Sequence, residues 1–421
     1  MLPILKHSGD LSHIFNRSQL DIDSVNEAVK NIIARVKAEG DNALFGYTAK
    51  FDNFNLDNSN LKLTQDEIDA AVNSVDKKTF NALQNAYKNI FDYHKRQIPK
   101  DDFKSSDKAG FVFRAVDSAG IYVPGGLAAY PSSVLMCAIP AIVARVKQIT
   151  MVTPPGKFLN PLTIAAASIC GIKDIYRVGV AQSIAALAYG TESIKKVDVI
   201  AGPGNIYVTA AKKQVFGDVG IDMIAGPSEI LIIADKTANY KYIAADLLSQ
   251  AEHDALSQSV LLSTSQGLAV AVNIELEKQI KLLPKKDIAL KALKNYGAIV
   301  LCDNLDQAIN LSNRIAPEHL ELCVENPQAI LKQITNAGAV FLGNYSPEPL
   351  GDYYAGTNHV LPTSSTARFS SGLGVDTYLK RISVVNYNKD DLKRVADDII
   401  LLATAENLDA HANSVRVRAN D

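Results

Sequence analysis

The sequence of 421 residues has no tryptophan, only four cysteines and no long apolar run. A helix that spans a bilayer needs about 20 mostly apolar residues in succession, so we expect no membrane span. The opening stretch MLPILKHSGDLSHIF is interrupted by charged residues, which argues against a secretory signal. The cysteines form no Cys-x-x-Cys motif, and each lies in an apolar stretch: Cys137, Cys170, Cys302 and Cys323. We therefore expect buried free thiols and a cytoplasmic protein.

An excess of charge of either sign is also missing. There are 43 basic and 45 acidic residues, a net charge of -2, which indicates no nucleic-acid or anionic-membrane partner. Hydrophobic residues make up 47% and charged residues 21%, the proportions of an ordinary soluble globular protein. The length allows two or three domains, each with its own core.

The pattern of apolar residues changes after the first hundred residues, which are predicted to be mainly helical. Ser24–Glu39 carries an apolar stripe with helical spacing, Thr64 and Glu67 form a capping-box pattern, and a long helix is predicted over about 78–97. From residue 119 onward, short apolar strands alternate with helices in two successive series. We predict an α/β fold with two Rossmann-like doubly wound domains.

The predicted borders follow from this alternation. The early helices need a sheet to cover, so we assign them to the sheet of the second β-α series. The expected segments are an N-terminal extension at 1–18, a first Rossmann-like domain at 19–121 plus 229–373, a second at 122–228, and a small C-terminal tail domain at 374–421.

Two strands run into glycine turns, Pro124-Gly125-Gly126 and Gly202-Pro203-Gly204-Asn205. Such turns let backbone amides approach a phosphate, but they are also common as ordinary tight βα turns. Neither turn has the Gly-x-Gly-x-x-Gly spacing of a dinucleotide site. The residues alone therefore leave open whether a nucleotide binds here.

Several polar clusters are candidates for chemistry. Gln250 and His253 lie three residues apart near a helix end and could address one ion, although a helix-end histidine is more often solvated. Glu318 and His319 adjoin a strand and could transfer protons, or form a surface pair. The segment 347–363 is predicted to be a polar, conformationally demanding loop with Asp352 among its side chains. Together with His411, the amide, imidazoles and carboxylate suit a divalent ion such as zinc.

Long motifs in order give the chain a resemblance to the histidinol dehydrogenase family over nearly its whole length. They are IYVPGG with AYPSSVLM (121–136), LAYGTESI (187–194), GPGNIYVTAAKKQVFG (202–217), IDMIAGPSEILIIAD (221–235), AADLLSQAEHD (244–254), APEHLEL (316–322), YSPEPLGDYYAGTNHVLPT (345–363) and ARFSSGLGVDTYLKR (367–381).

This resemblance implies roles for individual positions. The family's zinc ligands match Gln250, His253, Asp352 and His411, the last from the partner subunit of an intertwined homodimer. Its catalytic pair matches Glu318 and His319. Its NAD contacts match Tyr122, Gln182 and Asn205. Its substrate-binding positions match Ser228, Gln250, His253, His319, Asp352, His359, Glu406 and His411.

The implied reaction is the oxidation of L-histidinol through L-histidinal to L-histidine, the last steps of histidine biosynthesis. One zinc per subunit would orient the substrate, and two NAD would be consumed per turnover. Similar ligand sets also take manganese or cobalt, so the sequence does not identify the physiological metal.

Three positions depart from the family pattern. Cys137 replaces a common asparagine, Arg145 replaces a usual glycine, and Val180 replaces the second residue of a usual Gly-Gly. Val180 lies beside Gln182 and could narrow the NAD site.

Two other interpretations remain at this point. The first is a cysteine-dependent aldehyde dehydrogenase, with Cys137 or Cys323 as the nucleophile. The second is a protein of the same fold that binds metal and ligand without catalysis, which the intact acid-base pair disfavours.

Overall fold

The computed structural model describes residues 2–15, 20–125, 130–155 and 159–421. Gly126 of the first glycine turn lies outside these residues. The chain divides into two compact units. The first unit comprises Met1–Ile98 with Val116–Tyr378, and the second comprises Pro99–Ala115 with Leu379–Asp421. No helix in the described part of the chain is both long enough and apolar enough to cross a bilayer.

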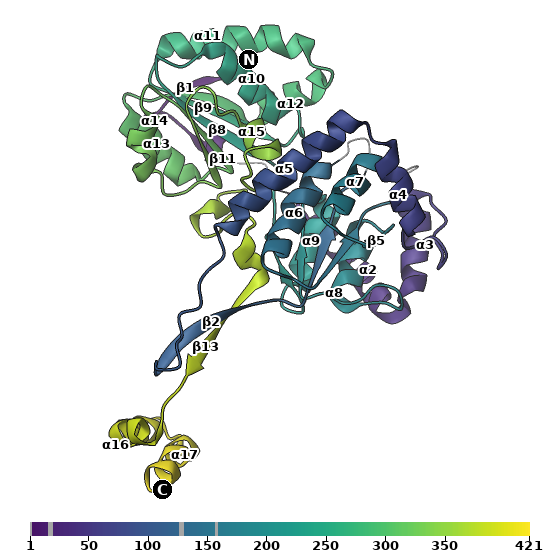
Figure 1. Ribbon diagram of the computed structural model, residues 1–421. Helices are drawn as coiled ribbons and strands as arrows, with labels where there is room; N and C mark the ends of the chain where they lie inside the picture. The colour runs from purple at the N-terminus through teal and green to yellow at the C-terminus, as the bar shows by residue number, and fades with distance from the viewer. Residues whose placement is uncertain (1, 16–19, 126–129, 156–158) are drawn as a thin grey trace. The chain divides into compact units, whose positions relative to one another are not determined.

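The first unit contains two parallel sheets and most of the helices (Figure 1). Its strands are β1 (Ile4–Lys6), β3 (Ser118–Tyr122), β4 (Gln148–Val152), β5 (Asp174–Tyr176), β6 (Val199–Ala201), β7 (Gly220–Ile221), β8 (Glu229–Ala234), β9 (Gln258–Ser263), β10 (Gly297–Leu301), β11 (His319–Cys323) and β12 (Ala339–Leu342). Its helices are α1 (Ser12–Phe15), α2 (Asn26–Glu39), α3 (Asp41–Asp52), α4 (Gln65–Ser74), α5 (Lys77–Lys95), α6 (Pro131–Val143), α7 (Pro161–Ile169), α8 (Val180–Tyr189), α9 (Ile206–Val215), α10 (Tyr240–Ala251), α11 (Gln266–Gln279), α12 (Lys286–Tyr296), α13 (Leu305–Ile315), α14 (Pro327–Ile330) and α15 (Glu348–Tyr353).

The larger sheet has six parallel strands in the order β1-β10-β9-β8-β11-β12. Along β8, Ile230 and Ile232 face a core shared with α10, α11 and α12, whereas Leu231 and Ile233 face a core shared with α13. Because side chains alternate across a strand, helices cover both faces of this sheet, as a doubly wound fold requires. The β-α series predicted from the sequence is therefore confirmed.

The smaller sheet has five parallel strands in the order β5-β4-β3-β6-β7. Helix α8 packs against β3 and β6, and α6 packs against β3. The predicted capping box is present at the start of α4, where Thr64 accepts from the backbone of Glu67 and Glu67 bonds back to Thr64. The mixed α/β fold with two Rossmann-like parallel sheets agrees with the sequence analysis.

The early helices pack differently from our expectation. Helix α2 contacts α8 and α9, and α3 contacts α8, so both lie with the five-stranded sheet rather than with the six-stranded one. The apolar face of α2, with Val29 and Val36, joins the core that contains Ile184 and Leu187 of α8. The sequence argument assumed that these helices must cover a sheet, but an apolar face is buried equally well against other helices. The first residues also contribute β1, which pairs in parallel with β10.

The second unit combines two segments that are distant in sequence. Strand β2 (Ala109–Ala115) pairs antiparallel with β13 (Leu379–Val385), and helices α16 (Lys389–Ala405) and α17 (Asp409–Ala419) pack against each other. Strand β2 lies within the range 19–121 that we assigned to the first Rossmann-like domain. Apart from these differences in packing, the predicted domain borders stay a prediction.

Candidate active site

The predicted acid-base pair lies at the amino end of β11, between β8 and β12 in the six-stranded sheet. Glu318 directly precedes the strand, and His319 is its first residue. Both side chains are buried. The side chain of Glu318 accepts a hydrogen bond from the backbone N–H of Glu229, at 2.8 Å from N to Oε2. The start of β8 therefore fixes the carboxyl group beside the imidazole.

The hydrogen bonds of His319 define which ring nitrogen can react. Its Nδ1 lies 3.0 Å from the carbonyl oxygen of Glu229 and 3.5 Å from Oε2 of Glu318. A carbonyl oxygen only accepts, so Nδ1 carries the proton and a neutral ring has its lone pair on Nε2. Nε2 is buried, has no hydrogen-bond partner among the described residues, and lies 3.9 Å from Oδ1 of Asp352. The site thus contains a base that is oriented and free to accept a proton.

Burial shifts the pKa values of this pair in opposite directions. It lowers the pKa of His319 to about 4, so the imidazole is neutral at physiological pH. It raises the pKa of the Glu318 carboxyl well above its usual value, which makes its carboxylate a stronger proton acceptor. Two groups whose pKa values are driven apart by their surroundings are typical of acid-base catalysis.

The segment 347–363 contributes Asp352 and His359 to the cluster around Glu318 and His319. We predicted this segment to be a loop, but its first part forms the short helix α15, which begins after Pro347. His359 Nδ1 lies 3.2 Å from the carbonyl oxygen of Asp352, and its Nε2 lies 3.5 Å from Oγ of Ser133. Burial lowers the pKa of His359 to about 4 and raises the pKa of Asp352 to about 6.

Gln250 lies in the last turn of α10, and His253 lies just beyond the end of this helix. Gln250 is fully buried, and neither its Oε1 nor its Nε2 has a partner among the described residues. His253 is exposed just beyond the helix, and its charge lowers the pKa values of His319 and His359. Asp352 and His253 therefore lie close enough to His319 to act on it, and Gln250 directly follows Ser249, which hydrogen-bonds Glu348 of the same cluster.

The remaining predicted residues are distributed as follows. Ser228 is half-buried and directly precedes β8. Glu406 follows α16 and His411 lies in α17, and both are exposed on the second unit. Whether these two reach a site on a partner subunit stays a prediction.

The sequence analysis missed Glu348 and Glu229. Glu348, His319 and Asp352 place their ligand atoms within 4.8 Å of one another, which is close enough for a common metal ion. Glu348 also hydrogen-bonds the Asp352 carboxyl, and burial together with the Asp352 charge raises the Glu348 pKa to about 8. The spacing of four residues between Glu348 and Asp352 was a usable signal, because a helix would place both on one face. Nothing in the sequence marked Glu229.

The predicted cofactor residues lie at the carboxyl edge of the five-stranded sheet. Tyr122 ends β3 and is buried, which raises its pKa to about 12. Gln182 in α8 is fully buried, and both of its amide atoms lack a partner among the described residues. Asn205 follows β6 and caps α9 by accepting from the backbone N–H groups of Tyr207 and Val208. This edge is where ligands usually bind to parallel sheets.

The second glycine turn has a structural reason for its first glycine. Gly202 has a φ of +125°, and a Cβ there would lie 2.1 Å from the carbonyl oxygen of Tyr122. Lys212 and Asp222 form a buried ion pair that also holds the turn. Lys212 Nζ donates to the carbonyl oxygen of Gly202, and Asp222 accepts from the backbone N–H of Gly202. The close approach to Tyr122 accounts for Gly202 without a phosphate.

Val180, one of the departures from the family pattern, has a φ of +52°. A β-branched residue in this region is strained, at a cost of about 1–3 kcal/mol. We predict that Val180→Gly lowers the free energy of unfolding less than Ala181→Gly does, because glycine relieves the strain at position 180. This order is expected even though the substitution of valine removes more apolar atoms than that of alanine. Urea titrations of both variants measure this. A larger loss of stability for Val180→Gly would contradict the claim that Val180 is strained.

The same variant also tests the cofactor site. If Val180 narrows the NAD site, Val180→Gly should lower the KM for NAD.

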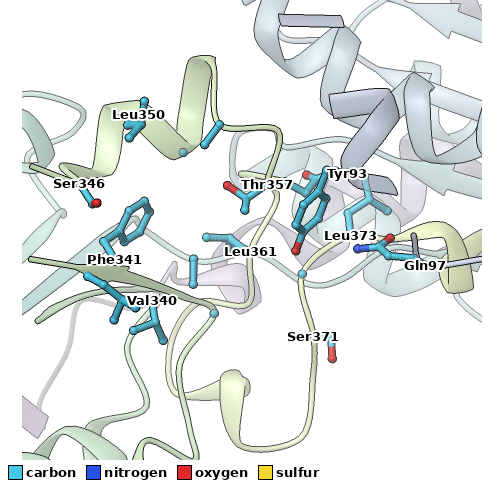
Figure 2. Close-up of a pocket in the computed structure, with 17 residues that line it drawn as sticks. Tyr93, Gln97, Val340, Phe341, Ser346, Leu350, Thr357, Leu361, Ser371 and Leu373 are labelled. Atoms are coloured by element: carbon cyan, nitrogen blue, oxygen red, sulfur yellow. The ribbon is translucent and has the colours of Figure 1, made fainter. Parts of the chain in front are cut away.

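A cavity of about 630 Å³ lies beside the site and not in it. Figure 2 shows Val340 and Phe341 of β12 on one wall and Tyr93 and Gln97 on the other. None of the predicted site residues lines the cavity in the described part of the chain. Phe341, which lines the cavity, has its ring centre 6.1 Å from that of His319. The acid-base cluster, not the cavity, is the better candidate for catalysis.

Comparisons with known proteins agree with the resemblance seen in the motifs. The profile of the family described as histidinol dehydrogenase matches residues 15–419. The histidinol dehydrogenase of Caldanaerobacter subterraneus is 54% identical over 413 residues, 97% of this chain and 96% of that protein. The Bacillus subtilis histidinol dehydrogenase is 51% identical and covers 93% of this chain and 92% of its own length.

A solved structure extends this similarity to the fold. The crystal structure of histidinol dehydrogenase from Elizabethkingia anophelis superimposes with a TM-score of 0.95 at 40% identity, over 100% of this chain and 98% of that one. Profile, sequence identity and fold agree over nearly the full length. The chain therefore belongs to the histidinol dehydrogenase family.

Proposed function

We propose that this protein oxidises L-histidinol through L-histidinal to L-histidine, with zinc and NAD, as the last steps of histidine biosynthesis in the cytoplasm. Family membership supports the substrate. The observation that carries the chemistry is the buried Nε2 of His319, which has no partner among the described residues and whose tautomer is fixed by the carbonyl oxygen of Glu229.

His319 would act as the general base in the first oxidation. Its Nε2 takes the proton of the substrate hydroxyl while the carbon loses a hydride, and the product of this step is the aldehyde. Glu318, beside it, would accept a proton from the water that hydrates the aldehyde before the second oxidation. Burial of both groups keeps bulk water and competing amines away from a reactive aldehyde.

The residues around His319 are a suitable set for zinc. The two unpartnered amide atoms of Gln250 are costly to bury, and a metal bound by Oε1 would remove part of that cost. Gln250, His253, Asp352 and His411 of the partner subunit would hold the ion. When bound, it would orient the substrate by its nitrogen atoms.

The residues at the carboxyl edge of the five-stranded sheet would bind NAD, which accepts the hydrides when it is bound. Gln182 supplies two buried polar atoms in need of partners, Tyr122 ends β3, and Asn205 lies in the turn after the neighbouring strand β6. The turns here do not have the usual dinucleotide spacing, so side chains would carry more of the recognition.

A homodimer is supported by the second unit, which exposes a cluster of large apolar side chains. On α16, α17 and the turn between them these are Ile399, Leu401, Leu402, Leu408 and Val417. Exposed apolar clusters of this kind are typical of protein interfaces. Their presence beside His411 and Glu406 fits a shared active site.

A mixing experiment tests whether His411 acts across the interface. We expect His319→Ala and His411→Asn homodimers to be inactive, because each lacks one part of both sites. A statistical mixture should regain up to about a quarter of wild-type activity, since about half of its dimers are mixed and one of the two sites in each mixed dimer is complete. The absence of rescue in mixed dimers confirmed by mass spectrometry would contradict the shared site.

The proposed function is tested by the stoichiometry of turnover. With L-histidinol, we expect two NADH per L-histidine, measured by absorbance and by chromatography of the product. One NADH with release of the aldehyde would show a single-step alcohol dehydrogenase. Binding of zinc and histidinol without any NADH would show the binding protein considered above.

A further inference from the structure

Glu348 lies between the end of α10, which carries Gln250, and the end of α15, which carries Asp352. It is the first residue of α15 and is almost completely buried. Its backbone N–H donates to Oε1 of Glu321 in β11, at 2.9 Å. The start of α15 is thus fixed to the strand that begins with His319.

The carboxyl group of Glu348 contacts both ligand-bearing helices. Its Oε2 accepts a hydrogen bond from Oγ of Ser249, at 3.3 Å, and Ser249 directly precedes Gln250 in α10. One turn further along α15, the Asp352 and Glu348 carboxyl groups have oxygens within 4.8 Å of each other, and a hydrogen bond between the two groups contributes to the shifts of their pKa values. One side chain therefore bridges the residue before Gln250 and the carboxylate of Asp352.

We propose that Glu348 is a positioning residue for the metal site: its carboxyl joins Ser249 of α10 to Asp352 of α15 and so fixes the spacing and orientation of the ligands. The inference rests on the proposed function, which assigns Gln250, His253 and Asp352 to the metal. Partners behind the ligands commonly change metal affinity by about 10–100-fold when they are removed.

The contacts of Glu348 favour positioning over direct ligation. Its backbone and one carboxyl oxygen are engaged by Glu321 and Ser249, and its carboxyl also bonds Asp352. Gln250, in contrast, has both amide atoms free of partners among the described residues. A ligand without protein partners is available to an ion, whereas an engaged carboxyl is suited to holding its neighbour.

Two substitutions at Glu348 separate these roles. Glu348→Gln keeps an oxygen that accepts from Ser249 and an N–H that donates to Asp352, so it should bind zinc nearly as well as the wild type. Glu348→Asp keeps the carboxyl group but is one methylene shorter, so it should weaken zinc binding by about 10–100-fold. Asp246→Asn is the matched control. Asp246 is a half-buried carboxyl of the same cluster, and its bond is to Glu321 and not to Asp352.

The measurements are zinc dissociation constants by chelator competition and the visible spectrum of the Co²⁺-loaded protein, with melting temperatures to show that each variant is folded. Weak binding and an altered cobalt spectrum for Glu348→Asp alone would support positioning. Equal loss in Glu348→Gln would overturn it in favour of direct ligation, and equal loss in Asp246→Asn would overturn it in favour of a general charge effect. Unchanged binding in all three overturns this inference alone, whereas a wild type that binds no zinc overturns the proposed metal site as well.

Discussion

Replacing His319 with asparagine is expected to lower kcat by about 10²–10⁴-fold, the usual contribution of a general base. The amide Nδ2 of asparagine can still donate to the carbonyl oxygen of Glu229, as Nδ1 of His319 does. What is lost is Nε2, the buried acceptor without a partner among the described residues. The fold should therefore remain, and the KM for histidinol should change much less than kcat.

The control for this prediction is the pair Cys137→Ser and Cys323→Ser. Both cysteines are buried, and burial raises the pKa of each thiol, so neither supplies a thiolate at neutral pH. We expect both serine variants to keep most of the turnover. If His319→Asn were active and a serine variant inactive, the protein would use a cysteine nucleophile and the proposed base would be wrong.

The sequence predicted the two parallel sheets well because buried parallel strands leave a strong local signal. Runs such as Ile230–Ala234 are apolar at every position, since helices cover both faces of the sheet. The N-terminal strand β1 was missed because it has only three residues, two of them apolar, which is too short to show the alternation of a strand. Its pairing with β10 depends on contacts almost 300 residues away in the sequence.

The packing of the early helices was not predictable in the same way. The apolar stripe of α2 indicates a helix with one buried face, but it does not say which surface covers that face. Val29 and Val36 fit the apolar residues of α8 as well as they would fit any sheet. Partner choice depends on shape and connection length, which a single sequence does not show.

The candidate site shows the same limit at the level of side chains. The motifs identified Glu318, His319 and Asp352, but only the fold shows that Nε2 of His319 faces Asp352. The site lies at the amino ends of β8 and β11, although ligands of parallel sheets usually bind at the carboxyl ends. No rule of spacing would have led from the sequence to this edge.

Removal of the metal is the second change with a very large expected effect. Chelation should abolish turnover, and added zinc should restore it, because the substrate would lose the ion that orients it. Zinc at about 100 times its dissociation constant should also stabilise the protein by about 2.7 kcal/mol, seen as a higher melting temperature. Full activity in protein shown by elemental analysis to be free of metal would contradict the proposed role.

Two buried glutamines give this prediction a matched control. Gln250 and Gln182 are both fully buried, and all their amide atoms lack partners among the described residues. Leucine at either position removes two unsatisfied polar atoms, so we expect the metal-free protein to become more stable by about 1–3 kcal/mol in each case. The functional losses should differ: Gln250→Leu should weaken zinc binding and leave the binding of NAD intact, whereas Gln182→Leu should raise the KM for NAD and leave zinc binding intact. Stability gained together with a specific loss of binding would mean that each amide is kept for its ligand, and a loss of zinc binding in both variants would argue against two separate sites.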